Sequence, residues 1–335
     1  MRRLPPALVL LAACAPDAAI APGARPAAVL SSAARAVETG VAIDGAPLGR
    51  PGMTAWDQWT TRNGGRRPLY VMWFTDWSAG FQGYAVDNAR SRQSVPVITW
   101  EMKSGRRAIT YADVLAGKWD GYVDTWGRAA AAKGGRIVLR FGHEMNGNWY
   151  GWSGSANGGT QAAADQFKAV WRRVRTRLHA VGATNVEMAW CPNHESVPAD
   201  AAWNTPSAYY PGAGQVEWLC MDGYNWGTSQ TVTANGWKSE WKTFDQTFRA
   251  VYDQITALDA AAPVMIGEFA SSELGGGKPG WIADAAARMS GADYPRVRAF
   301  IWFNYNKETD WRVESTTASL DAFRSAFAQT PFVWR

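Results

Sequence analysis

Short apolar runs alternate with segments of helical periodicity along most of this chain of 335 residues. The runs are almost continuously apolar, as expected of parallel strands that are covered on both faces. They span residues 40–43, 69–74, 95–100, 136–141, 186–190, 216–221, 264–267 and 297–303. The clearest helical patterns lie at residues 113–132, 161–180, 241–258, 279–289 and 320–328. This alternation predicts the α/β class and a single (β/α)8 TIM barrel. The first run is the weakest, and without it a doubly wound sheet would be the alternative.

The first 35 residues differ in composition from the rest of the chain. In residues 1–14, Arg2 and Arg3 precede a short apolar stretch that ends in Leu-Ala-Ala-Cys14. This ending resembles a bacterial lipobox, in which cleavage leaves the cysteine as the lipidated first residue of a lipoprotein. Residues 15–35 are rich in alanine and proline, which predicts a flexible tether to a barrel domain at residues 36–335. We therefore expect an extracytoplasmic protein of the cell envelope, anchored in a membrane through Cys14, with ordinary secretion as the alternative.

Charge and cysteine content narrow the range of partners. The formal net charge is +5, and the arginines of residues 172–177 are expected to form the solvated face of one helix. We predict no nucleic-acid partner, and we expect a monomer. Besides Cys14 the chain has only Cys191 and Cys220, near the ends of neighbouring predicted strands. An oxidising compartment allows a disulfide between them, and two buried free thiols are an equal alternative.

The candidate chemistry lies at the ends of two predicted strands. The apolar run 136–141 is followed by His143 and Glu144, and the run 264–267 is followed by Glu268. In (β/α)8 barrels the active site forms at the carboxyl ends of the strands, so we expect the two glutamates to meet at the barrel mouth. Two carboxyl groups in this relation are the minimum apparatus for glycoside hydrolysis.

Other polar and aromatic residues are expected on the same rim. They are Asp76, Glu101, Asn193, Asp222, Tyr224 and Trp302. A pocket of Phe141, Trp149 and Tyr150 would exclude water and raise the pKa of the acid, as a general acid requires near neutral pH. The nucleophile must stay ionised, and Tyr224 and Arg140 are candidate donors to it. For Arg140 a salt bridge in the barrel core is an equal alternative.

Tryptophan is unusually frequent, at 20 of 335 residues. Nine tryptophans fall at or just past the ends of the apolar runs, where flat indole faces would support sugar rings. These are Trp73, Trp77, Trp100, Trp149, Trp152, Trp190, Trp226, Trp302 and Trp311. About half of them, with Trp73 and Trp190 first, are expected to belong to the core instead.

Several motifs together resemble glycoside hydrolase family 26. The segments RFGHEMNGNWYGW at residues 140–152 and IGEF at residues 266–269 carry the resemblance. It continues at residues 190–193, 209–212, 221–225, 300–303, 307–308 and 310–312. The best-known members of this family are endo-β-1,4-mannanases, and relatives act on mixed-linkage β-glucan and on xylan.

The resemblance implies a role for individual residues. Glu144 would be the acid/base and Glu268 the nucleophile of a double displacement with retention of configuration. His143 would lie beside the reacting sugar, Tyr224 would bind the nucleophile, and Trp302 would lie under the cleaved ring.

The substrate is a β-linked polysaccharide on this resemblance. By the commonest activity of the family we expect β-1,4-mannan, with β-1,3-1,4-glucan, xylan or a bacterial exopolysaccharide as alternatives. The loop at residues 149–152 has fewer aromatic residues than the mannanase pattern and resembles the non-mannanase branch at least as much. Mannose and glucose differ at the 2-hydroxyl group, for which His143 and Asn193 are candidate readers.

The sequence favours neither a zinc enzyme nor a protein that only binds polysaccharide. A zinc site of the HExxH kind is not expected, because Gly147 stands four residues after His143, and we expect neither a metal nor a cofactor. A non-catalytic lipoprotein that binds polysaccharide is the alternative outside the enzymes. The presence of both Glu144 and Glu268 favours the enzyme.

Overall fold

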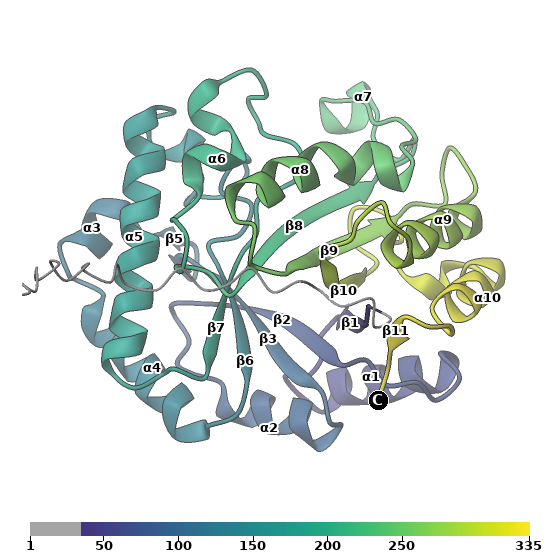
Figure 1. Ribbon diagram of the computed structural model, residues 1–335, viewed down its shortest axis with the longest axis horizontal. Coiled ribbons are helices and arrows are strands. Elements are labelled where there is room, and N and C mark those ends of the chain that lie inside the picture. The colour runs from purple at the N-terminus through teal and green to yellow at the C-terminus, as the bar shows by residue number, and fades with distance from the viewer. Residues whose placement is uncertain (1–34) are drawn as a thin grey trace, which may run out of the picture. The chain divides into compact units, whose positions relative to one another are not determined.

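The eight apolar runs form parallel strands that close into a barrel (Figure 1). The structure, a computed structural model, describes residues 35–335. The barrel strands are β1 (Val37–Ile43), β2 (Tyr70–Asp76), β3 (Val95–Glu101), β6 (Ile137–Phe141), β7 (Val186–Trp190), β8 (Trp218–Asn225), β9 (Val264–Ser271) and β10 (Val297–Asn304). Closure comes from β1, which pairs with β10 on one side and with β2 on the other. The predicted (β/α)8 barrel, including its weak first strand, is confirmed.

Helices surround the strands on the outside of the barrel (Figure 1). They are α1 (Arg50–Arg62), α2 (Gly83–Ser91), α3 (Tyr111–Leu115), α4 (Asp120–Lys133), α5 (Gln161–Ala180), α6 (Pro206–Tyr209), α7 (Val232–Asn235), α8 (Phe244–Leu258), α9 (Lys278–Ser290) and α10 (Thr317–Ala326). Single 3-10 turns are η1 (Ser155–Asn157), η2 (Ala202–Asn204) and η3 (Val313–Ser315). A hairpin of β4 (Lys103–Ser104) and β5 (Arg107–Ala108) follows β3, and β11 (Phe332–Val333) pairs with β1. The helix predicted at 113–132 is divided into α3 and α4, because the chain turns at Gly117 with a φ of +80°.

Aromatic side chains fill the shell between the strands and the helices. Trp100 of β3 stacks on Trp126 of α4 with ring centroids 4.7 Å apart, and Phe141 of β6 lies 5.8 Å from Trp171 of α5. Seven of the nine tryptophans expected near the rim are buried, with at most 2% of their surface exposed. They are Trp73, Trp77, Trp100, Trp152, Trp190, Trp302 and Trp311. The high tryptophan content therefore serves packing more than the prediction allowed.

The arginines of α5 form ion pairs with neighbouring elements. Arg173 and Arg177 lie 2.6 and 2.9 Å from the carboxylate of Asp120 on α4, and Arg175 lies 2.7 Å from Glu217. These pairs tie α5 to α4 and to the segment before β8. The basic stretch is therefore part of the packing of the helical layer.

The predicted signal peptide, the lipidation site Cys14 and nearly all of the tether at residues 15–35 lie outside the described residues. Between residues 35 and 335 no helix is both long and apolar enough to cross a membrane. The lipid anchor, the location in the cell envelope and the monomeric state stay predictions.

Closure of the barrel gives a first testable prediction. A Cβ atom at Gly40 of β1 would lie 2.7 Å from the carbonyl oxygen of Phe300, 2.9 Å from Ile301 Cγ1 and 3.0 Å from Tyr70 Cβ. Gly40→Ala should therefore reduce the free energy of unfolding by about 1–3 kcal/mol, because β1 must shift between its two neighbours. Chemical denaturation measures this loss.

Gly121→Ala on α4 is the matched control, since no atom lies within 4 Å of the added Cβ. It should leave stability unchanged or raise it by up to about 1 kcal/mol. Equal stability of the Gly40 variant and the wild type would contradict the close packing of β1 against β10 and β2.

Candidate active site

A strained turn after β6 brings Glu144 into the barrel mouth. Gly142 and Glu144 have φ values of +54° and +51°, a region that residues with a side chain rarely adopt. Strain of this kind costs on the order of 1–3 kcal/mol and persists where the surrounding structure enforces it. Here the backbone N–H of Glu144 donates to the carbonyl of Cys191 at 2.7 Å, which ties the turn to the end of β7.

The carboxyl group of Glu144 is nearly enclosed. Only 6% of the residue is exposed, and its two oxygens accept hydrogen bonds from Trp149 Nε1 at 2.7 Å and from Asn193 Nδ2 at 2.8 Å. Burial and the nearby negative charge of Glu268 raise the pKa of Glu144 to about 7, and the two donors oppose this rise. Glu144 is therefore a carboxylic acid that holds its proton close to neutral pH.

Trp149 reaches Glu144 by lying across a glycine. A Cβ atom at Gly147 would stand 2.5 Å from the indole ring, so only glycine leaves room for it. Asn146, which the sequence analysis did not identify, joins the loops after β6 and β7. It donates to the carbonyl of Asn193 at 2.9 Å and accepts from the N–H of Asn193 at 2.8 Å. Trp149 is therefore positioned by a glycine of its own loop, and Asn193 by a side chain of the neighbouring loop.

Glu268 has a different environment, although it is equally buried. Its residue is 5% exposed, and it accepts from Arg140 Nη1 at 2.9 Å and from the hydroxyl group of Tyr224 at 2.5 Å. His143 Nε2 lies 4.0 Å from the same carboxylate. Asp222 of β8 is its partner in the strand register. Glu268 is therefore held by two strong donors, one of them charged.

Arg140 crosses the interior of the barrel and is completely buried. It donates to Thr99 Oγ1 at 2.7 Å, to Glu268 and to the carboxylate of Asp222. Its Nε also lies 3.2 Å from Cys191 Sγ. Both interpretations of Arg140 in the sequence therefore hold, since it is a core ion pair and a donor to Glu268.

One guanidinium group faces three carboxyl groups in this cluster. Asp222 and Glu268 both bind Arg140, whereas the donors to Glu144 are uncharged. Burial raises the pKa of Asp222 as well, but its ion pair with Arg140 favours the charged form. The proton that the cluster retains is therefore expected on Glu144.

His143 and Tyr150 border the two glutamates. The hydroxyl group of Tyr150 lies 3.1 Å from His143 Nε2, and the Tyr150 ring stacks on Trp152 with centroids 4.3 Å apart. Burial, and then the charge of Arg140, lower the pKa of His143, so the imidazole is neutral. A Cβ atom at Gly151 would stand 2.8 Å from Ala108 Cβ, so the β4–β5 hairpin packs directly on this loop.

Two aromatic residues predicted for the site face away from it. Trp302 is fully buried and packs 4.9 Å from Phe269 and 5.4 Å from Phe323 of α10, in the shell outside the barrel. Phe141 also points into this shell. The prediction of Trp302 under the cleaved ring is therefore wrong, because successive strand residues point to opposite faces. The inward neighbour Phe303 lies 5.6 Å from the ring of Tyr224.

A loop after β10 supplies an aromatic ring next to Tyr224. The Trp311 ring lies 4.8 Å from that of Tyr224, and its carbonyl oxygen accepts from Trp302 Nε1 at 3.0 Å. Lys278 of α9 donates to the carbonyl of Arg312 at 2.7 Å and of Asp310 at 3.3 Å, on either side of Trp311. Nothing in the sequence identified Lys278, because its partners are backbone carbonyls of a distant segment.

The other rim carboxylates have local partners. Asp76 accepts from the backbone N–H of Ser78 at 2.7 Å, and Glu101 lies 2.8 Å from Lys103 Nζ. Burial raises the pKa of Glu101, and the ammonium group of Lys103 opposes this.

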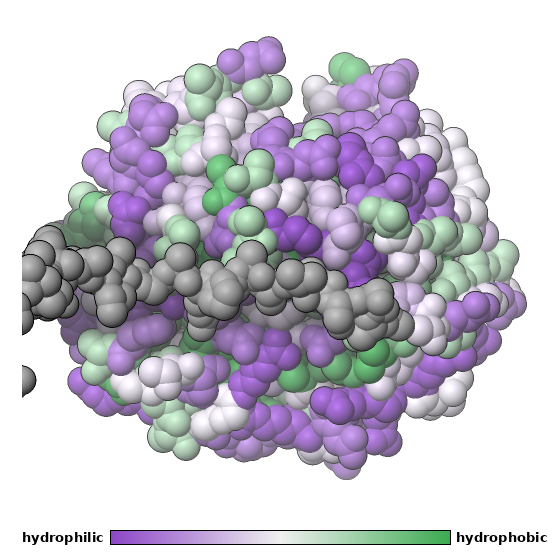
Figure 2. Space-filling model, viewed as in Figure 1, coloured by the Kyte–Doolittle hydropathy of each residue, from purple (hydrophilic) through white to green (hydrophobic). Residues whose placement is uncertain are grey.

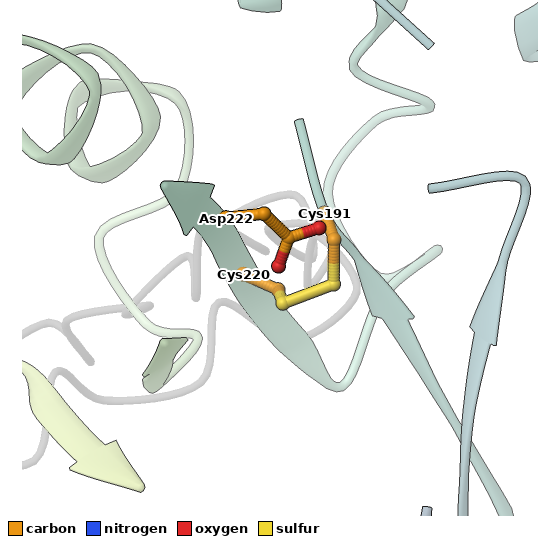
Figure 3. A group of neighbouring side chains, drawn as sticks. All are labelled: Cys191, Cys220 and Asp222. Carbon is orange, nitrogen blue, oxygen red and sulfur yellow. A yellow bond between two sulfur atoms is a disulfide. The ribbon is translucent and has the colours of Figure 1, made fainter. Parts of the chain in front are cut away.

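Cys191, directly after β7, and Cys220, within β8, form a disulfide, which resolves the alternative left open by the sequence. Figure 3 shows the carboxylate of Asp222 beside this bridge. The sulfur atoms and an Asp222 oxygen lie within 4.8 Å of one another. Because the sulfurs are bonded to each other, they are not thiolate ligands, and the bridge is interpreted as a brace beneath the charged cluster.

Comparison with known proteins identifies relatives by sequence. The sequence model described as glycosyl hydrolase family 26 matches residues 109–264, which include Glu144 and end shortly before Glu268. Endoglucanase H of Acetivibrio thermocellus is 35% identical over 265 residues, an alignment that covers 78% of this chain and 28% of the relative. The chain thus spans about 28% of the length of that relative.

Solved structures share the fold. The catalytic domain of a family 26 endo-β-1,4-mannanase from Bacillus sp. JAMB-750 matches with a TM-score of 0.62 and 16% identity, covering 90% of this chain and 88% of the other. A family 26 β-mannanase from Bacteroides ovatus matches with a TM-score of 0.59 and 17% identity, covering 90% of each chain. At this identity the likeness concerns the fold. Together with the matches in sequence, it confirms the predicted resemblance, and the chain belongs to glycosyl hydrolase family 26.

Proposed function

We propose that this chain is a retaining endo-β-glycanase that cleaves a β-linked glucan, with Glu144 as acid/base and Glu268 as nucleophile. The observation that carries the proposal is the contrast between the two buried glutamates. Glu144 has only neutral donors and a pKa of about 7, whereas Glu268 is held by Arg140 and Tyr224. A double displacement requires one carboxyl group that donates a proton and a second that attacks, and this contrast in hydrogen-bond donors suits the two roles.

The reaction follows from these two states. Glu144 gives its proton to the glycosidic oxygen while a carboxylate oxygen of Glu268 attacks the anomeric carbon, and the bond to the leaving sugar breaks. The resulting glycosyl ester on Glu268 is attacked by water, from which the ionised Glu144 now takes a proton. The bond to Glu268 then breaks, the glycan is released with retained configuration, and both glutamates return to their first states.

The arrangement also argues against a protein that only binds polysaccharide. Hydrogen bonds from surface side chains and exposed aromatic rings are sufficient for binding. An enclosed carboxylic acid that keeps its proton near pH 7, opposite a carboxylate stabilised by a charged donor, has a cost in stability that binding does not explain. Proton donation explains it.

The substrate proposal follows the relative in sequence. Endoglucanase H carries its activity in its name and is 35% identical, whereas the mannanases share the fold at 16–17% identity. The loop around Tyr150 and Gly151 also departs from the mannanase pattern. We therefore place β-glucan, including mixed-linkage glucan, ahead of the β-1,4-mannan expected from the family's commonest activity.

Substitution of the two glutamates tests the mechanism. Glu268→Ala should abolish turnover, because no covalent intermediate forms. Glu144→Ala should lower kcat on polysaccharide by about 10²–10⁴-fold and retain more activity on aryl glycosides, whose leaving group needs no proton. Azide should rescue this variant and give a glycosyl azide of retained configuration, measured by NMR.

Asp321→Ala on the exposed side of α10 is the control and should match the wild type. Full activity of either glutamate variant on polysaccharide would refute the assignment. An inverted first product from the wild type would remove Glu268 as nucleophile.

The pH dependence of activity tests the environment of Glu144. Only the protonated acid can donate, so kcat should fall as the pH rises through about 7, the pKa to which burial and Glu268 raise this group. Trp149→Phe removes a donor to the ionised form, so the pKa should rise further and the basic limb should move to higher pH. Trp237→Phe changes an exposed tryptophan that does not contact Glu144, and its profile should stay unchanged. A basic limb that stays in place in Trp149→Phe would contradict the role of this hydrogen bond.

A panel of polysaccharides tests the substrate class. Mixed-linkage β-glucan, β-1,4-glucan, β-1,4-mannan, xylan and the exopolysaccharide of the producing organism should be compared, with product lengths analysed at early times. We expect oligosaccharides from a β-glucan, and a much lower rate on mannan, since a site built around one hydroxyl position discriminates strongly. Release of monosaccharide alone would refute endo action. Cleavage of mannan but not of glucan would overturn the substrate while leaving the mechanism intact.

A further inference from the structure

Aromatic side chains lead from Glu268 out of the barrel mouth along the β8–α8 segment, residues 226–243. The hydroxyl group of Tyr224 binds Glu268, and the Tyr224 ring lies 6.1 Å from the ring of Trp226. The Trp226 ring lies 5.4 Å from that of Trp237, at an interplanar angle of 80°. Trp237, which the sequence analysis did not identify, keeps 44% of its surface exposed. We call Tyr224, Trp226 and Trp237 the aromatic path, because each ring contacts the next from the nucleophile to solvent.

The β8–α8 segment presents Trp237 on a braced backbone. Asn225 Oδ1 accepts from the N–H groups of Gly227 and Lys242, so one buried amide holds both ends of the segment. Further out, the N–H of Gln230 donates to Ser239 Oγ at 3.0 Å, and the N–H of Ser239 donates to the carbonyl of Gln230 at 3.2 Å. The indole is therefore positioned before a ligand arrives, which reduces the entropy lost on binding.

The β8–α8 segment and the loop after β9 that bonds to it expose both apolar and polar groups. Val232 on α7 is 66% exposed, and Leu274, whose carbonyl accepts from the N–H of Thr228, is 52% exposed. Figure 2 shows a hydrophobic spot over α7 within a largely hydrophilic surface. Exposed apolar surface rimmed by polar residues is typical of a binding site.

We propose that Trp226 and Trp237 form an outer subsite that binds the apolar face of a neutral pyranose residue of the polysaccharide. This rests on the proposed function, because the subsite lies on the path that begins at the proposed nucleophile. A flat indole matches the C–H groups of a pyranose face, and the ring hydroxyls then point sideways to polar groups. Lys238 and Glu240, an exposed pair at 3.2 Å, lie within three residues of Trp237 and supply such groups.

The dependence of kcat/KM on substrate length reveals an outer subsite. In an endo-acting enzyme a short aryl glycoside fills only the sites around the cleaved bond, whereas a longer chain also reaches the outer ones. A side chain that binds a distant sugar therefore affects only the longer substrates. A side chain that merely supports the loop affects all lengths alike.

The experiment compares wild type, Trp237→Ala and Trp237→Phe on a short aryl glycoside and on β-gluco-oligosaccharides of increasing length. In Trp237→Ala, kcat/KM should be unchanged on the aryl glycoside and roughly tenfold lower on the longest oligosaccharides. Trp237→Phe should recover most of the loss, because a flat ring remains. Val333→Ala is the matched control, because this exposed apolar residue of β11 lies beside the first residues of β1, away from the aromatic path, and it should equal the wild type at every length.

Equal values for Trp237→Ala and wild type at all lengths would overturn the proposal, and so would an equal loss at all lengths. If the wild type cleaves no polysaccharide, it is the proposed function that fails. The subsite is then tested by affinity electrophoresis in gels that contain the same polysaccharides. Retardation of the wild type that is lost in Trp237→Ala supports the subsite, and mobility that no polysaccharide alters refutes it.

Discussion

The structure of the active site depends on one buried guanidinium group. Arg140 binds Thr99, Asp222 and Glu268, and so connects β6 with β3, β8 and β9 across the barrel interior. Buried charges are tolerated only when they are paired and hydrogen-bonded, and removal of one partner leaves the others uncompensated. Since a single positive charge cannot balance three carboxylates, the cluster favours one protonated member. The proton is expected on Glu144, the carboxyl group without a charged donor.

The loops at the barrel mouth provide the hydrogen bonds that further adjust the pKa of Glu144. Glu144 occupies a left-handed backbone conformation that its hydrogen bond to the end of β7 maintains, and the same region supplies Asn193 as a donor. Trp149 approaches from the other side over Gly147. These donors moderate the pKa of Glu144, which burial alone would raise further. An acid that titrates near neutral pH is therefore the product of two opposed effects, burial and neutral hydrogen bonds.

The sequence predicted the barrel and its two glutamates because strand ends are marked by hydrophobicity and a following carboxylate. It did not predict side-chain direction, which changes with every residue of a strand. Trp302 was therefore assigned to the mouth, whereas its neighbour Phe303 faces inward. Lys278 illustrates a second limit, since its acceptors are backbone carbonyls that follow β10 and carry no signal of side-chain chemistry. The abundance of tryptophan was also a misleading guide, because most of these rings fill the shell beneath the helices.

The charged cluster and the surfaces proposed for substrate recognition thus lie in different parts of the molecule. Arg140, Asp222 and Glu268 belong to barrel strands, whose neighbours are fixed by register and burial, and Glu144 stands three residues after the end of β6. The residues proposed to contact a long substrate belong to loops, such as Tyr150, whose neighbour Gly151 packs on the β4–β5 hairpin, and Trp237 beyond β8. Gly151 leaves room for Ala108 to pack against this loop. A larger residue at this position would alter the wall of the barrel mouth without contacting the charged cluster. This separation would allow a barrel of this family to keep one charged cluster while the loops around its mouth vary.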